Sequence, residues 1–99
     1  MKLEKNYEGK DLIVEVNDRI DTVNAPDFEN EIMEEVGKFD SLTLDFTNLE
    51  YISSSGLRVL VKLEKKLKPE NIPFTIKNLN PALQEIFKIS GFDKLLNIE

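Results

Sequence analysis

Short strand-like and helix-like segments alternate along this chain, and this alternation limits the folds that it can adopt. Residues 3–7, 42–46 and 72–76 alternate apolar and polar side chains, and residues 12–16 are almost wholly apolar. Both patterns are typical of strands that bury one or both faces. Glu8-Gly9-Lys10, which reads as a turn, separates residues 3–7 from residues 12–16, so we expect these two strands to form a hairpin.

Three further segments carry apolar residues at helical spacing. Phe28, Ile32 and Val36 recur every four residues, in a helix that we expect to begin with Asn24 as its cap and to stop at Gly37. The other two helices are expected at residues 57–67, ended by Pro69, and at residues 80–91.

The expected order of elements is β-β-α-β-α-β-α, with a short last strand within residues 95–98. Polar residues 17–23 read as a loop. The strand–helix–strand units imply parallel neighbours, whereas the first hairpin is antiparallel. We therefore predict an α/β fold over residues 1–99 as a single domain, with a mixed sheet of about four or five strands and helices packed mainly on one face.

Composition excludes several functions. The 99 residues include no cysteine and no histidine, which removes thiol chemistry, the commonest general base and the commonest metal ligands. The net charge of −6 disfavours nucleic acid and anionic membranes. No run of apolar residues is long enough to cross a membrane, and the first residues do not resemble a signal peptide. We expect a cytoplasmic protein with no cofactor and no metal.

The segment between the strand at 42–46 and the helix at 57–67 contains Ser53-Ser54-Ser55-Gly56. A strand end followed by a helix start is where ligands gather in open parallel sheets. Serine is also a good N-cap, so the run could serve only to satisfy the free N–H groups at the start of the helix. Without histidine, a hydrolase with a serine nucleophile is disfavoured, although a serine–lysine pair with Lys62 or Lys65 stays open.

Charge is unevenly divided between the first two expected helices. The first carries five acids and the second five bases: Asp27, Glu29, Glu31, Glu34 and Glu35 against Arg58, Lys62, Lys65, Lys66 and Lys68. Two readings stay open, namely two solvated faces and a docking surface with a preferred partner charge.

Residues 44–60, Leu-Asp-Phe-Thr-Asn-Leu-Glu-Tyr-Ile-Ser-Ser-Ser-Gly-Leu-Arg-Val-Leu, resemble the signature of the STAS domain, and in particular of the bacterial anti-sigma-factor antagonists. Arg19-Ile20-Asp21, with Ala25-Pro26 after it, resembles the family's segment leading into its first helix. Residues 80–92 resemble its C-terminal helix and turn. The resemblance covers nearly the whole chain.

The resemblance implies a binding protein and not an enzyme. In such antagonists the unphosphorylated form binds an anti-sigma factor, itself a serine kinase, and so frees a sigma factor; phosphorylation blocks the binding and a serine phosphatase restores it. The acceptor serine falls on Ser54, with Ser53 standing where many members have Asp. The resemblance implies six partner-binding residues: Asp21, Ser53, Ser55, Gly56, Leu57 and Arg58.

Two alternatives remain at this point. The missing Asp at position 53 leaves three adjacent serines as acceptors, so Ser53 and Ser55 stay open beside Ser54. The same domain also occurs without phosphorylation, which leaves an adaptor in a transport or signalling assembly as the second function.

Overall fold

The computed structural model describes Met1 and residues 3–99. Within them, five strands form a mixed sheet in the order β1-β2-β4-β6-β7. These strands are β1 (Glu4–Glu8), β2 (Asp11–Glu15), β4 (Ser41–Asp45), β6 (Phe74–Lys77) and β7 (Asn97–Ile98). The β1–β2 hairpin is antiparallel and the other three pairs are parallel, which confirms the predicted mixed sheet.

A second, two-stranded parallel sheet was not predicted. It pairs β3 (Asp18–Ile20) with β5 (Leu49–Ile52), so the loops expected at 17–23 and 47–56 are each partly strand. Both strands are too short to display a clear period, and each is stabilised by hydrogen bonds to the other rather than by a local pattern. This small sheet continues from the ends of β2 and β4 and leads the chain into the first two helices.

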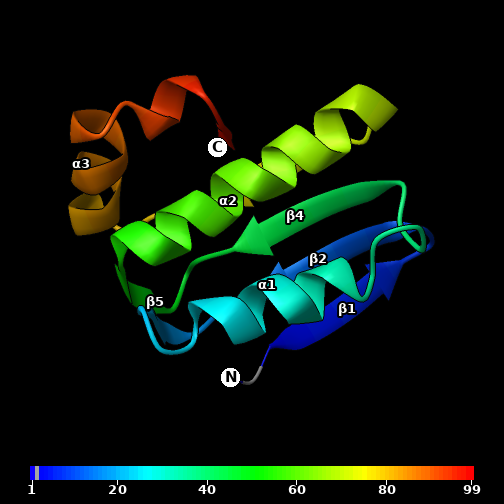
Figure 1. The fold of residues 1–99 in the computed structure, drawn as a ribbon, viewed down its shortest axis with the longest axis horizontal. Coiled ribbons are helices and arrows are strands. Elements are labelled where there is room, and N and C mark those ends of the chain that lie inside the picture. The colour runs from blue at the N-terminus through cyan, green and yellow to red at the C-terminus, as the bar shows by residue number, and fades with distance from the viewer. Residues whose placement is uncertain (2) are drawn as a thin grey trace.

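The three helices are α1 (Ala25–Met33), α2 (Ser54–Leu67) and α3 (Pro81–Ile89). Figure 1 shows α1 and α2 lying along the same side of the main sheet, whereas α3 stands beyond the beginning of α2. One-turn 3₁₀ helices follow α2 at Lys68–Glu70 and α3 at Phe92–Lys94. The helices therefore pack mainly on one face, as predicted.

Helix α1 is shorter than predicted. The expected helix reached Gly37, but regular α structure ends at Met33, and residues 34–38 form turns with three-residue steps, such as Val36 N–H to Met33 O at 3.2 Å. The last turn of α1 carries no basic residue to complement the negative end of the helix dipole. Val36 still packs against the core as a partly buried residue, which is why its spacing looked helical.

The strands of the main sheet bury one side chain in two, toward α1 and α2. The buried positions on the three central strands are Leu12, Val14, Leu42, Leu44, Phe74 and Ile76. The helices supply the matching stripes, which include Phe28, Ile32, Leu60, Leu63 and Leu67. The opposite face of the sheet is only partly covered. This alternation fixes the register of each strand, because a shift by one residue would expose the core side chains.

A candidate protein-binding site at the start of helix α2

Ser53 links strand β5 to helix α2 and acts as the helix cap. Its backbone is extended (φ −83°, ψ 170°), and its Oγ accepts a hydrogen bond of 3.1 Å from the N–H of Gly56. The residue is only 7% exposed. The capping interpretation of the serine run is therefore confirmed for Ser53, whose hydroxyl is buried and occupied.

Ser54 and Ser55 lie inside the first turn of α2, three residues earlier than the helix was expected to begin. Because successive residues of a helix are rotated by about 100°, the two hydroxyls point to different sides. Ser54 is exposed and Ser55 is half-buried. Of the three serines, only Ser54 is exposed.

Gly56 allows the start of α2 to lie directly on the small sheet. A Cβ at this position would come within 2.7 Å of Ile52 Cγ1 and 2.8 Å of Ile20 Cγ2. These distances are shorter than van der Waals contact, so the close approach of helix and sheet depends on the missing side chain. Leu57 is buried behind it. Gly56 and Leu57 therefore help to position the serine turn, and their predicted contact with a partner stays a prediction.

Asp21 lies beside this turn because strands β3 and β5 are parallel and paired. Ile20 is the register partner of Ile52, and the N–H of Ser53 donates to the carbonyl oxygen of Ile20 at 2.8 Å. Asp21 and Ser53 thus follow adjacent strand ends. The structure therefore brings together Asp21 and the serine turn, which are both parts of the partner-binding set that the sequence resemblance implied.

The carboxylate of Asp21 accepts hydrogen bonds within its own loop, between β3 and α1. Its Oδ1 accepts hydrogen bonds of 2.9 Å from the N–H groups of Val23 and Asn24. Asn24 occupies the N-cap position of α1, but its side chain makes no cap hydrogen bond; its Oδ1 accepts from the N–H of Asp21 at 2.8 Å instead. The predicted position of Asn24 as the cap residue is confirmed, but it makes no side-chain cap hydrogen bond, because its oxygen accepts from Asp21 in the preceding loop.

Three exposed side chains near Asp21 were not among the predicted site residues. The guanidinium of Arg19 lies 5.2 Å from the centre of the Tyr51 ring, and Arg19 Nε is 3.4 Å from Asp21 Oδ2. Tyr51 is 44% exposed and Val23 is 88% exposed. Since Arg19 and Tyr51 are register partners in β3 and β5, only the unpredicted strand pairing could have revealed them. Exposed apolar and aromatic surface of this kind is common in protein interfaces.

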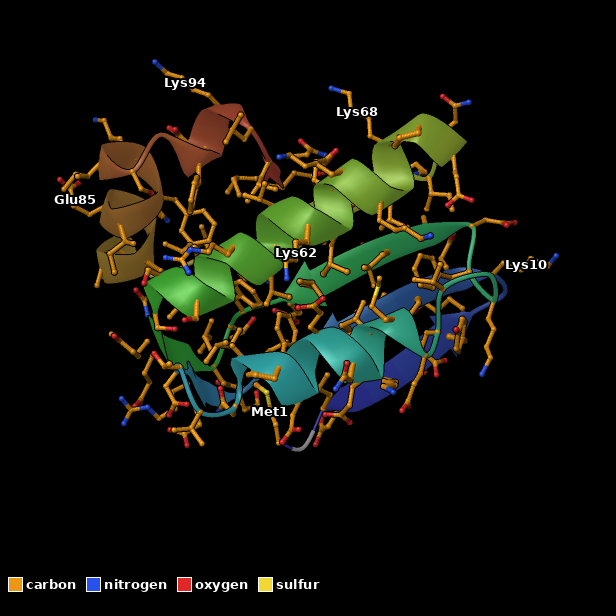
Figure 2. All side chains as sticks on the ribbon, viewed as in Figure 1. Met1, Lys10, Lys62, Lys68, Glu85 and Lys94 are labelled. Carbon is orange, nitrogen blue, oxygen red and sulfur yellow. The ribbon has the colours of Figure 1, made fainter. Side chains whose placement is uncertain are left out.

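Arg58 is exposed on α2 beside a shallow groove between α1 and α2. The groove has a volume of about 210 Å³ and is lined by Thr22, Ala25, Pro26, Glu29, Ser55, Arg58, Val59 and Lys62. Across it, Lys62 Nζ is 3.4 Å from Glu29 Oε1. Among the described residues, this is the ion pair that joins the acidic helix α1 to the basic helix α2. Figure 2 shows Lys62 in the middle of α2 and Lys68 near its far end.

Asp45, at the end of β4, organises the polypeptide leading toward the small sheet. Its Oδ1 accepts from the N–H of Thr47 at 3.0 Å, from Thr47 Oγ1 at 2.6 Å and from Asn78 Nδ2 at 3.0 Å. Partial burial acts to raise the pKa of Asp45, but the hydrogen bonds from Asn78 and Thr47, with the charge of Lys77, outweigh it and lower the pKa below its usual value.

Over Met1 and residues 3–99, no group of three acidic side chains is arranged to hold a metal ion. In the same residues, no helix is both long and apolar enough to cross a membrane. The start of α2 combines a capped helix end, the exposed hydroxyl of Ser54, the exposed ring of Tyr51 and an exposed arginine, Arg58. Such a surface suits contact with another macromolecule better than chemistry on a small molecule.

The fold is an α/β domain in which a five-stranded mixed sheet is covered mainly on one face and a serine turn opens the second helix. The family model of the STAS domain matches residues 2–99. The chain therefore belongs to the STAS domain family. Within that family it groups with the bacterial anti-sigma-factor antagonists, as the following relatives show.

BtrV is a curated protein of Bordetella bronchiseptica that is named as a candidate anti-sigma factor antagonist. It is 34% identical to this chain over 93 residues, and the match covers 93% of this chain and 80% of BtrV. A crystal structure of an anti-sigma factor antagonist from Mycobacterium paratuberculosis is 26% identical, with a TM-score of 0.88 over 98% of this chain and 83% of that one. Unphosphorylated SpoIIAA, an anti-sigma factor antagonist, has the same fold at 14% identity, with a TM-score of 0.84 over 99% of this chain and 88% of SpoIIAA.

Proposed function

We propose that this chain is a cytoplasmic anti-sigma-factor antagonist whose unphosphorylated form binds an anti-sigma factor that is also a serine kinase. Binding frees the sigma factor, and phosphorylation of Ser54 by the bound kinase ends the interaction. A separate serine phosphatase returns the chain to its binding form. The observation that carries the proposal is the exposure of Ser54 in the first turn of α2, beside Ser53, which is buried and accepts the cap hydrogen bond.

Exposure supports Ser54 over its neighbours as the acceptor. A kinase must bind the acceptor hydroxyl in its own active site. The hydroxyl of Ser53 is buried and that of Ser55 is half-buried, so both are less accessible to a kinase than the hydroxyl of Ser54. A phosphate at the start of a helix is also tolerated, because the N-terminal N–H groups and the dipole favour negative charge there. The fold can therefore persist while its surface charge changes.

The remaining residues of the site have distinct roles in this proposal. Asp21 shapes the β3–α1 loop, Gly56 and Leu57 fix the position of α2, and Arg58 is available to a partner. Ser55 lies in the groove beside Arg58. A partner that covers Ser54 also contacts this loop and this groove, so the phosphate would lie within the interface.

Phosphorylation is tested with each anti-sigma-factor serine kinase encoded in the source genome, purified and mixed with the chain and ATP. Intact-mass measurement should show addition of one phosphate with a cognate kinase, abolished in Ser54→Ala and retained in the matched control Ser55→Ala. Full labelling of Ser54→Ala would contradict the choice of acceptor. Treatment with a serine phosphatase should remove the phosphate.

Binding is tested by titrating the same kinase with the wild type, Ser54→Asn and Ser54→Asp. We expect Ser54→Asn to bind within a few-fold of wild type and Ser54→Asp to bind at least about tenfold more weakly, which is about 1.4 kcal/mol. Equal binding of the two variants would contradict the switch. Stable binding to a non-kinase assembly, with no phosphorylation, would favour the adaptor function instead.

A further inference from the structure

The exposed ridge of α2 carries Ser54 and a line of cations. At about 100° per residue, Arg58 and Lys65 fall within a narrow arc of Ser54 on the side opposite the core. All three are exposed, while the other side of the helix is buried through Leu60 and Leu63. The single acid of α2, Glu64, is half-buried and lies to the side of this ridge. Ser54 is thus the neutral end of a positively charged ridge.

Arg58 is the cation of this ridge nearest to Ser54, four residues along the helix, where side chains of positions i and i+4 meet. None of the ion pairs within the described part of the chain includes Arg58. Lys62, one turn further, is already paired with Glu29 at 3.4 Å. The guanidinium of Arg58 can therefore take a new anion without losing an existing partner.

The surroundings of Arg58 suit a phosphate group. Arg58 lines the groove of about 210 Å³ together with Ser55, Thr22 and Lys62. Glu29 also lines the groove and is paired there with Lys62. The groove therefore offers one positive charge that is unpaired among the described residues, that of Arg58, and two hydroxyl groups at the edge of the Ser54 turn. A phosphoserine carries about −1.5 to −2 charges and accepts hydrogen bonds through three oxygens, and an arginine fork can bind two of them at once.

We propose that Arg58 binds the phosphate of phosphorylated Ser54 within the same chain. The proposal rests on the proposed function for the existence of that phosphate. Arg58 is accessible to a partner in the unphosphorylated form and is engaged by the phosphate in the other. Phosphorylation therefore has two effects at the start of α2. It adds negative charge at Ser54, and it makes Arg58, the one arginine of α2, unavailable to a partner.

The experiment uses the full chain with phosphoserine encoded at position 54 during translation, so that its outcome depends on no kinase. The second ionisation of the phosphate is followed by ³¹P NMR titration at low salt in otherwise wild-type protein, Arg58→Gln, Arg58→Lys and the control Lys94→Gln. Lys94 is exposed on the 3₁₀ turn after α3, where Figure 2 shows it projecting away from α2. Circular dichroism checks that every variant is folded.

An adjacent guanidinium favours the doubly charged phosphate. Arg58→Gln should therefore raise the phosphate pKa by about 0.3 to 1 unit, Arg58→Lys by less, and Lys94→Gln by no measurable amount. The shift should shrink at high salt, because an exposed pair is screened. An unchanged phosphate pKa in Arg58→Gln, or an equal rise in Lys94→Gln, would overturn the proposal. Absence of labelling in the kinase assay would instead count against the proposed function, whatever the titration shows.

Discussion

The N–H of Ser53 donates a hydrogen bond of 2.8 Å to the carbonyl oxygen of Ile20. This bond joins the end of β3 to the start of α2 and thereby holds the Asp21 loop beside the serine turn. The surface proposed to meet a partner is consequently built from two segments distant in sequence. Its geometry depends on caps, close packing and loop hydrogen bonds that can be tested one at a time.

Removing the cap of α2 should destabilise the fold. Ser53→Ala loses the hydrogen bond from Gly56 N–H to Ser53 Oγ, and we expect a decrease of about 1 kcal/mol in the free energy of unfolding. Urea denaturation measures the difference. Ser54→Ala, in the same turn but exposed, should change the stability by less than about 0.5 kcal/mol. Equal effects of the two substitutions would contradict the assignment of Ser53 as the cap.

Adding a methyl group at Gly56 should separate α2 from the small sheet. Although alanine favours helix by about 1 kcal/mol over glycine, the new Cβ would overlap Ile52 and Ile20. We expect Gly56→Ala to lower the free energy of unfolding by about 1–3 kcal/mol, measured by urea denaturation. Increased stability would show that the two isoleucines move aside without cost.

The Asp21 carboxylate should control the order of the loop before α1. Asp21→Ala removes the acceptor of the Val23 and Asn24 N–H groups. We expect these two amides to exchange with solvent at least several-fold faster in hydrogen-exchange NMR. Without the two hydrogen bonds to Asp21, opening of the loop costs less free energy and occurs more often. Asp21→Asn retains a side-chain oxygen and should preserve much of the protection. Unchanged exchange in Asp21→Ala would mean that the backbone alone maintains the loop.

Asp45 should contribute to acid sensitivity. Its pKa is lowered in the folded state, so the unfolded chain binds a proton more readily as pH falls. The stabilisation is therefore present above the unfolded pKa, about 3.9, and is lost as pH falls through the folded value. Asp45→Asn should be less stable than wild type at pH 6, and the difference should narrow toward pH 2. Urea denaturation across that range measures it, and a constant difference would contradict the assignment.

The sequence determined those features whose physical cause is local. The alternation at residues 42–46 and the helical spacing of Leu60, Leu63 and Leu67 arise between near neighbours, so they predicted β4 and α2 without a partner. The serine turn was recognisable for the same reason: serine before a helical pattern is a capping signal. The family resemblance located this turn within a whole domain.

Only the tertiary structure decided how the three serines differ and what surrounds them. Ser53 is buried because β5 pairs with β3, and Ser54 is exposed because α2 begins at that residue and turns it away from the core. Pairing of short strands is stabilised by groups far apart in sequence, which local periodicity does not record. The serine run that the sequence identified as a single motif is therefore, in three dimensions, a buried cap, an exposed hydroxyl and the edge of a groove.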